Sequence, residues 1–241
     1  MEEHIIIFII ALVTEIIGTV SGFGSSMLFV PLVGLVLPRP HVLGVTSLLH
    51  VFSNTVKVLM FRKHIDWRIA LKFGIPSLLL VIVGAFLAGS INDSWAQISL
   101  GLFLLLVSGL FFFFPQIKLK PTNASAIATG GVAGFVAGML GTGGAIRGAG
   151  LAAFGLSSSA FVGTSAAIDF GVDFSRMFIY ISEGFMPLGI LAMVPALLIA
   201  SVLGTWIGKK ILDRISQKVF RKIVLAMIFL MGVVLVVKQM M

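Results

Sequence analysis

Long apolar runs separated by short polar breaks follow one another along nearly the whole chain. Most runs have about 20 residues, the length that a helix needs to cross a hydrocarbon core of roughly 30 Å. The runs cover residues 4–36, 41–61, 69–90, 95–114, 123–156, 160–181, 186–208 and 217–237. No soluble domain fits between them, so the pattern predicts an all-α polytopic integral membrane protein.

The first and fifth runs are too long for a single helical crossing. Each is interrupted midway by small, glycine-rich sequence, at residues 18–26 and 138–144. Because glycine interrupts helices, we predict a broken helical hairpin in each run. The chain opens with Glu2 and Glu3 rather than with basic residues, so we expect the first run to be retained structure and not a signal peptide.

The second half of the chain repeats the first at an offset of about 119 residues. The glycine segment that begins at Ser21 aligns with the one that begins at Leu140. Further matches join Thr46 to Thr164, Ser47 to Ser165, Asn54 to Asp173, Lys57 to Arg176, Pro76 to Pro195 and Gly84 to Gly204. Glycine matches alone can arise by chance in a glycine-rich protein, but the charged and proline matches favour a duplication. We predict membrane repeats at residues 1–118 and 119–241, packed into one compact domain.

Positive charge gathers in three loops, which we place in the cytoplasm because cytoplasmic loops carry the excess of Lys and Arg. Their basic residues are Arg62, Lys63 and Arg68, then Lys118 and Lys120, and then Lys209, Lys210, Arg214, Lys218, Arg221 and Lys222. The loops at 91–93 and 182–184 carry no Lys or Arg and are placed outside. The basic loop of one half thus corresponds to the bare loop of the other. We predict two inverted-topology repeats, each a broken glycine-rich hairpin plus three spanning helices, with both termini outside; a parallel four-plus-four arrangement is the alternative.

Composition agrees with a membrane protein and excludes several kinds of site. Hydrophobic residues make up 59% of the chain and charged residues 11%, with a mean hydropathy of +1.15. The absence of cysteine excludes disulfides and thiolate metal sites. The net charge of +8 lies mostly in the loops, which indicates membrane orientation rather than nucleic-acid binding. The expected location is a bacterial or archaeal plasma membrane. The four histidines are scattered and form no His-Glu-x-x-His pattern, so we expect no metal, no cofactor and no enzyme activity.

The two glycine breaks are candidates for an anion-binding site. Broken helices in inverted repeats supply midplane sites in many transporters, and a helix that restarts presents N–H donors and a positive dipole end. The candidate residues there are Ser21, Gly22, Gly24, Ser25, Gly141, Thr142, Gly143 and Gly144. Two structural alternatives stay open: the small residues serve tight helix crossing, and the hydroxyls bond to the preceding turn of their own helix.

Ionisable residues inside the apolar runs are costly in lipid, so each indicates a pathway, a partner or a water-filled cavity. The candidate substrate-binding cations are Lys57, Arg147 and Arg176, and the candidate proton carriers are Glu15, His50, Asp169 and Asp173. Two sets lie at positions i, i+4 and i+7 of one helical face, namely His50, Asn54 and Lys57, and Asp169, Asp173 and Arg176. Histidine changes its charge near neutral pH, although a lone intramembrane histidine is more often a hydrogen-bonded core residue.

Each cation also has a structural alternative. Lys57 lies one turn from a basic loop, which slightly favours an ammonium group that reaches the inner interface. Arg176 can pair with Asp173 three residues earlier, although we favour a site role. Arg147 has no acidic residue nearby in sequence, so it invites an anionic ligand; its alternative is an ion pair with Asp169 or Asp173 across the bundle.

The glycine motifs resemble those of the sulfite exporter TauE/SafE family. The first copy reads Gly18-x-x-Ser21-Gly22-x-Gly24 followed by Pro31, and the second reads Gly134-x-x-x-Gly138-x-x-Gly141-x-Gly143-Gly144. The resemblance covers essentially the whole chain. It implies transport of a small organosulfur or sulfur oxyanion, such as sulfite or sulfoacetate, driven by the proton gradient. The sequence departs from the family at Ser25 and Ser26, where glycines are frequent, and Arg147 does not map to a family-wide position.

The leading hypothesis is a proton-coupled secondary exporter that works by alternating access around a midplane site between the repeats. A passive anion channel would use much the same cations. A partner-dependent membrane subunit would instead direct its intramembrane charges at a partner helix. The expected partners are the anion, protons and the lipid bilayer, with a homodimer as one candidate assembly.

Overall fold

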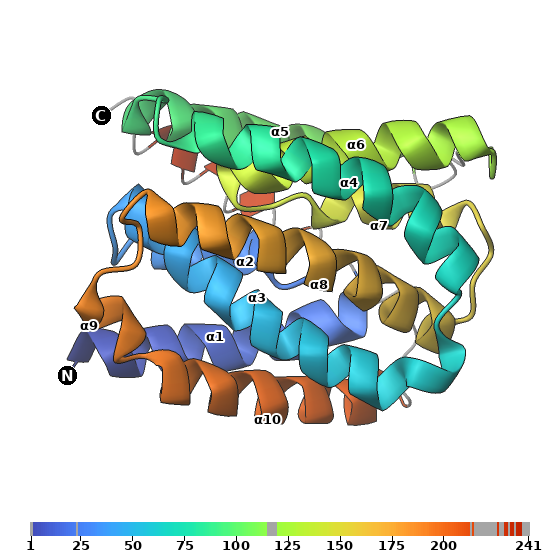
Figure 1. Ribbon diagram of the computed structural model, residues 1–241, viewed down its shortest axis with the longest axis horizontal. Helices are drawn as coiled ribbons and strands as arrows, with labels where there is room; N and C mark the ends of the chain where they lie inside the picture. Colours follow the sequence, from blue (N-terminus) through green and yellow to red (C-terminus); the bar gives the residue numbers. More distant parts are fainter. Residues whose placement is uncertain are drawn as a thin grey trace.

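The computed structural model describes residues 2–22, 24–114, 120–212 and 214, and part of 226–237. In these residues the chain forms helices and no strand. The helices lie in layers along one common long direction (Figure 1). Within the described residues, five segments are long and apolar enough to cross a membrane: Glu3–Ser21, Arg39–His64, Trp67–Ala88, Asn123–Leu140 and Val194–Leu212. The predicted all-α membrane protein is therefore confirmed.

The first half contains α1 (Glu2–Ser21), α2 (Ser26–Val33), α3 (Arg39–Phe61), the short 3₁₀ helix η1 (Arg62–His64), α4 (Trp67–Ala88) and α5 (Asp93–Phe113). The predicted break is confirmed, because α1 ends and α2 begins within the glycine-rich segment. Polar caps begin the later helices: the Asp66 carboxylate accepts a hydrogen bond from the Ile69 N–H at 3.0 Å, and Asn92 caps α5.

The second half contains α6 (Asn123–Leu140), α7 (Gly144–Ala152), α8 (Ser158–Ser182), α9 (Leu188–Leu191) and α10 (Val194–Leu212). The second glycine break is also confirmed, between α6 and α7. The run at 186–208 is divided into α9 and α10, because Pro195 in the first turn of α10 has no N–H with which to continue the preceding helix. The run at 217–237 lies largely outside the described residues.

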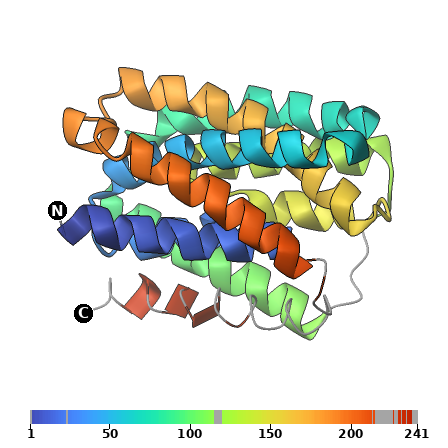
Figure 2. The ribbon, with the colours of Figure 1, turned by 90° about the horizontal axis from the view of Figure 1, so that it is seen from below.

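Helices of one half pack mainly against helices of the other. The long pairings are α4 with α6, α1 with α10, and α3 with α8. Figure 2 shows α1 and α10 side by side, with α3 and α8 toward the middle of the bundle in Figure 1. In the sequence repeat, α1 of the first half corresponds to α6 of the second, and α4 corresponds to α10. The contact of α4 with α6 is therefore the equivalent of the contact of α10 with α1.

Glycines allow the closest of these helix approaches. A Cβ atom on Gly134 of α6 would meet the backbone of Ser77 in α4, and one on Gly138 would meet the backbone of Val81. A Cβ atom on Gly204 of α10 would meet Cβ of Glu15 in α1. Small residues that let backbones approach are a common device in membrane helices. Tight crossing, one of the two alternatives for the glycine-rich sequence, thus applies to these positions.

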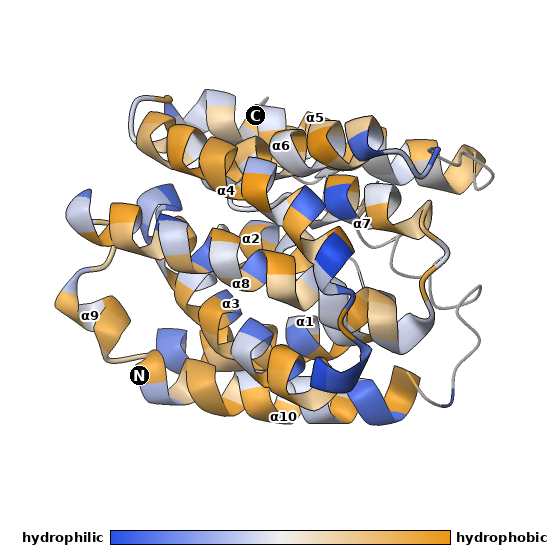
Figure 3. Ribbon diagram, turned by 45° about the vertical axis from the view of Figure 1, so that its right-hand side comes forward, coloured by the Kyte–Doolittle hydropathy of each residue, from blue (hydrophilic) through white to orange (hydrophobic). Residues whose placement is uncertain are grey.

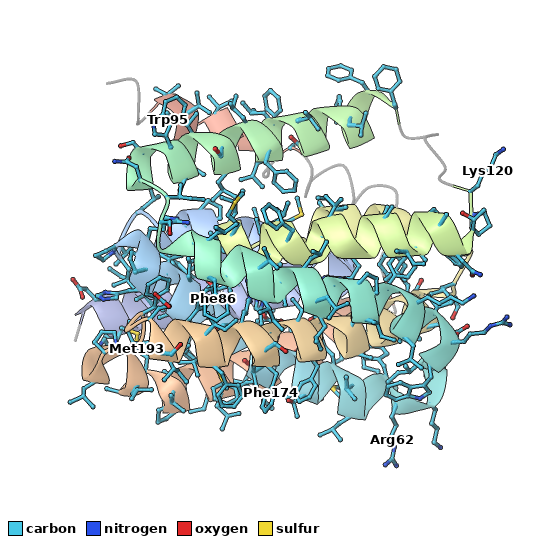
Figure 4. The ribbon with its side chains drawn as sticks, turned by 45° about the horizontal axis from the view of Figure 1, so that its top comes forward. Arg62, Phe86, Trp95, Lys120, Phe174 and Met193 are labelled. Atoms are coloured by element: carbon cyan, nitrogen blue, oxygen red, sulfur yellow. The ribbon has the colours of Figure 1, made fainter. Side chains whose placement is uncertain are left out.

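The described basic segments gather at one end of the molecule. Arg62 and Lys120 lie toward the same end in Figure 4, whereas Trp95 lies toward the other. Lys209, at the end of α10, lies over the Phe61 ring with its Nζ 5.1 Å from the ring centroid, so this segment reaches the same end. Between the ends the ribbons are largely hydrophobic (Figure 3).

Candidate functional site

The two glycine breaks meet in the interior of the molecule. Gly141 ends α6 with a left-handed φ of 80°, and Gly22 and Gly24 follow α1 with φ of 72° and 87°. These conformations need glycine, because a Cβ atom is strained there. The Thr142 hydroxyl donates to the Ser26 hydroxyl at 3.2 Å and joins the second break to the first. Both half-helices, α2 and α7, therefore restart beside one another.

Asp173 of α8 gathers polar groups from both central helices. Its Oδ2 accepts a hydrogen bond from the Asn54 amide at 2.7 Å, so two residues that match in the sequence repeat contact each other. Its Oδ1 lies 2.6 Å from the Arg176 guanidinium, and its Oδ2 lies 3.6 Å from Nδ1 of His50. Arg176 also donates to the Ala137 carbonyl at 2.6 Å, near the end of α6. The ion pair that was the structural alternative for Arg176 is present.

Lys57 is buried and paired. The prediction that its ammonium group reaches the inner membrane interface is therefore wrong. Its Nζ lies 2.8 Å from Oε2 of Glu15 and 3.4 Å from the Ser53 hydroxyl. A carboxylate on α1 compensates the buried ammonium, which removes the need to reach water. The other oxygen of Glu15 accepts from the Ser25 hydroxyl, and the Ser25 oxygen lies 2.9 Å from Nε2 of His50. Glu15 thus connects α1 to the first break and to α3.

Arg147 of α7 is paired as well. Its Nη1 forms an ion pair with Oδ1 of Asp169, and its Nε donates to the Ser165 hydroxyl at 3.0 Å. The expectation of an unpaired cation is therefore wrong, and the alternative of a pair with Asp169 is correct. The partner stands on α8, beyond the end of α7, so the residues next to Arg147 in the sequence do not reveal it.

A small polar cavity lies between the breaks and the central helices. Predicted substrate residues on its wall are Gly24, Ser25, Lys57, Gly141, Gly143, Gly144, Arg147 and Arg176, and predicted proton carriers on its wall are His50, Asp169 and Asp173. The space open to the centres of water molecules is about 20 Å³, close to the room that one water needs. The cavity is thus too small to hold a sulfur oxyanion as it stands.

Four predicted residues lie off this wall. Ser21 donates to the Gly18 carbonyl of its own helix at 3.3 Å, as the helical alternative proposed. Gly22 lines a second, neighbouring cavity. The Thr142 hydroxyl donates its hydrogen bond to Ser26, and the Glu15 carboxylate is bonded to the Lys57 ammonium group.

Four polar residues on or beside the wall were not among the candidate site residues. Ser26, Ser53 and Asn54 line the cavity, and the Ser165 hydroxyl accepts a hydrogen bond from Arg147. Asn54 shares a helical face with His50 and Lys57, and Ser165 belongs to the repeat matches. The spacing and the repeat could therefore have indicated these two residues as site residues.

The charges around the cavity balance. Lys57, Arg147 and Arg176 are matched by the three carboxylates described above. An anion therefore has no preformed free cation here among the described residues. In the same part of the chain no group of three His, Cys, Asp or Glu side chains is placed to hold a metal ion.

Comparison with known proteins identifies the family. Residues 7–235 match the family described as Sulfite exporter TauE/SafE. A search of curated proteins finds no match. The match spans both glycine breaks, the central helices and the charged cluster, and membership implies membrane transport of sulfite or a related anion. The chain belongs to the sulfite exporter TauE/SafE family.

Proposed function

We propose that the protein is a proton-coupled secondary transporter that exports a small organosulfur or sulfur oxyanion, such as sulfite or sulfoacetate. The observation that carries the proposal is the meeting of both glycine breaks at a buried cavity whose wall includes Lys57, Arg147 and Arg176. Half-helix ends and buried cations are the groups that bind oxyanions in such sites. Membership of the TauE/SafE family supports this class of substrate.

Alternating access between inverted repeats is the proposed mechanism. The exchange of helix partners between the halves, α4 with α6 and α1 with α10, supports a pseudo-twofold relation. The small cavity is lined from both halves, so a movement of one half against the other would enlarge it for an anion. We place the basic end in the cytoplasm and the N-terminus outside, because the described basic segments lie together.

Transport by purified protein in liposomes tests this proposal. Uptake of sulfite, sulfoacetate, thiosulfate, sulfate and taurine is measured with and without a pH gradient. We expect saturable, gradient-dependent flux of at least one sulfur anion, and a loss of this flux in Arg147→Ala and Arg176→Ala. The control is Arg68→Ala, which removes an exposed cation outside the cavity.

Two results would contradict the proposal. Folded wild-type protein that carries none of these anions would exclude the sulfur-anion substrate. Flux that follows the anion gradient without saturation and ignores the pH gradient would show a channel.

A further inference from the structure

Asp169 lies where two cavities adjoin. It lines the central cavity and also the second cavity, whose wall includes Gly18, Gly22 and Val162. Val162 is near the start of α8, and Gly163, beside it, packs against Phe61 at the basic end of the molecule. The second cavity therefore extends from the central site toward the basic end, and Asp169 lines both cavities, together with Gly24, Asn54 and Lys57.

Asp169 is also the least enclosed carboxylate of the cluster. Its side chain is 17% exposed, compared with 3% for Asp173 and 0% for Glu15. Glu15 is bonded by both Lys57 and Ser25, and Asp173 by both Asn54 and Arg176. Among the hydrogen bonds of the described residues, Asp169 accepts from Arg147 alone. Protonation of Asp169 thus disrupts fewer contacts than protonation of either other carboxylate.

Charge balance requires such a step when an anion enters. The cluster holds three cations and three carboxylates, so an added anion leaves an uncompensated negative charge. An uncompensated charge is costly in the interior of a membrane protein. One proton on a carboxylate of the cluster restores the balance for a singly charged ligand and halves the excess for a doubly charged one.

We propose that Asp169 takes up one proton as the anion binds, and that this releases Arg147 to bind the anion. The proton goes to a carboxylate oxygen of Asp169, the ion pair with Arg147 breaks, and the freed guanidinium pairs with the ligand. Nε of Arg147 keeps its hydrogen bond to the Ser165 hydroxyl while Nη1 changes its partner from Asp169 to the anion. Proton and anion then cross together, so export through this step runs when the outward gradient of the anion exceeds the inward gradient of the proton. This assignment rests on the transport function proposed above.

Charged or titratable groups from three helices surround Asp169. The charged or titratable groups nearest to it are Arg147 of α7, His50 and Lys57 of α3, and Asp173 of its own helix. Lys57 stays paired with Glu15 and Asp173 stays paired with Arg176. His50 is held between Ser25 and the Asp173 carboxylate.

The test compares the pH response of anion uptake in proteoliposomes. The probe is whichever of sulfite, sulfoacetate and thiosulfate the wild type carries, so a proton carried by the anion itself is common to all variants. We expect uptake by the wild type to rise up to about tenfold per unit of external acidification, the limit for a single coupled proton. Asp169→Asn loses the part of this response that exceeds the anion's own protonation, whatever its rate, and Asp169→Glu retains that part.

Matched variants separate the outcomes. Glu183→Gln, which alters an exposed carboxylate at the end of α8, keeps the wild-type pH response. A normal response in Asp169→Asn, or the same loss in Asp173→Asn alone, would overturn the assignment of Asp169 while leaving transport intact. Absence of flux in the wild type would instead reject the transport function itself.

A measurement on the wild type covers the case in which Asp169→Asn does not fold. Calorimetric titration of the anion in two buffers with different ionisation enthalpies gives the number of protons taken up on binding. The proposal requires about one proton per anion beyond that of the ligand, as linkage demands for one coupled site. Zero would overturn it.

Discussion

At the scale of single residues, the interior charges are held as pairs. Asp173, for example, is bonded to Asn54 and Arg176 and lies near His50. Removal of one partner from a buried pair leaves the other charge without compensation, which costs more than the pair itself contributes. The stability of the centre therefore depends on keeping both members of each pair.

We predict that Asp173→Ala lowers the free energy of unfolding by about 3–5 kcal/mol, the range for a broken buried pair. Thermal unfolding of the detergent-solubilised protein measures the change. Glu183→Ala is the control, because it removes an exposed carboxylate from the end of the same helix and should have a much smaller effect. Equal losses in both variants would contradict a structural role for the Asp173 pairs.

The sequence identified the interior charges and gave two of their pairings as alternatives, but it did not predict the pair of Lys57 with Glu15. Spacing on one helical face gave Arg176 and Asp173, because that pair is local. The pair of Lys57 with Glu15 joins α3 to α1, and the pair of Arg147 with Asp169 depends on where α7 turns back against α8. Contacts between elements depend on packing angles, which periodicity does not contain.

At the scale of elements, glycine serves two purposes that look alike in the sequence. Gly22, Gly24 and Gly141 turn the chain with positive φ values. Gly134 and Gly138 are ordinary helical residues that let α6 approach α4. The positions of the breaks were predictable from the density of glycine. Which glycines turn the chain and which let helices approach could be assigned only from the packed structure.

We predict that Gly134→Ala lowers the free energy of unfolding by about 1–3 kcal/mol, the usual cost of overpacking. The added methyl group would meet the backbone of Ser77. Gly74→Ala in α4 is the matched control, since nothing lies within 4 Å of its Cβ position. Thermal unfolding of the two variants distinguishes them, and a Gly134→Ala protein as stable as the control would contradict the close α4–α6 contact.

At the scale of the whole molecule, the distribution of basic segments sets the orientation in the membrane. Lys63 and Lys210 are exposed at the end that we place in the cytoplasm, and Ser90 is exposed in the opposite connection between α4 and α5. The natural chain has no cysteine, so single cysteines can be introduced without removing others.

We predict that a membrane-impermeant maleimide labels Ser90→Cys in intact cells, and labels Lys63→Cys and Lys210→Cys only after permeabilisation. The positive-inside distribution of charge is the physical reason. The cysteine-free wild type is the control for background labelling. Labelling of Lys210→Cys from outside while Lys63→Cys stays protected would favour the parallel arrangement of the halves.

The pairing of α1 with α10 also has a consequence for biogenesis. The ribosome makes α1 long before α10, so α1 enters the bilayer before its main packing partner exists. Glu15 also precedes its counter-ion, because Lys57 follows two helices later. Until α3 is inserted, the first hairpin therefore lies in the membrane without the counter-ion of its Glu15 carboxylate, and its final docking follows the synthesis of α10.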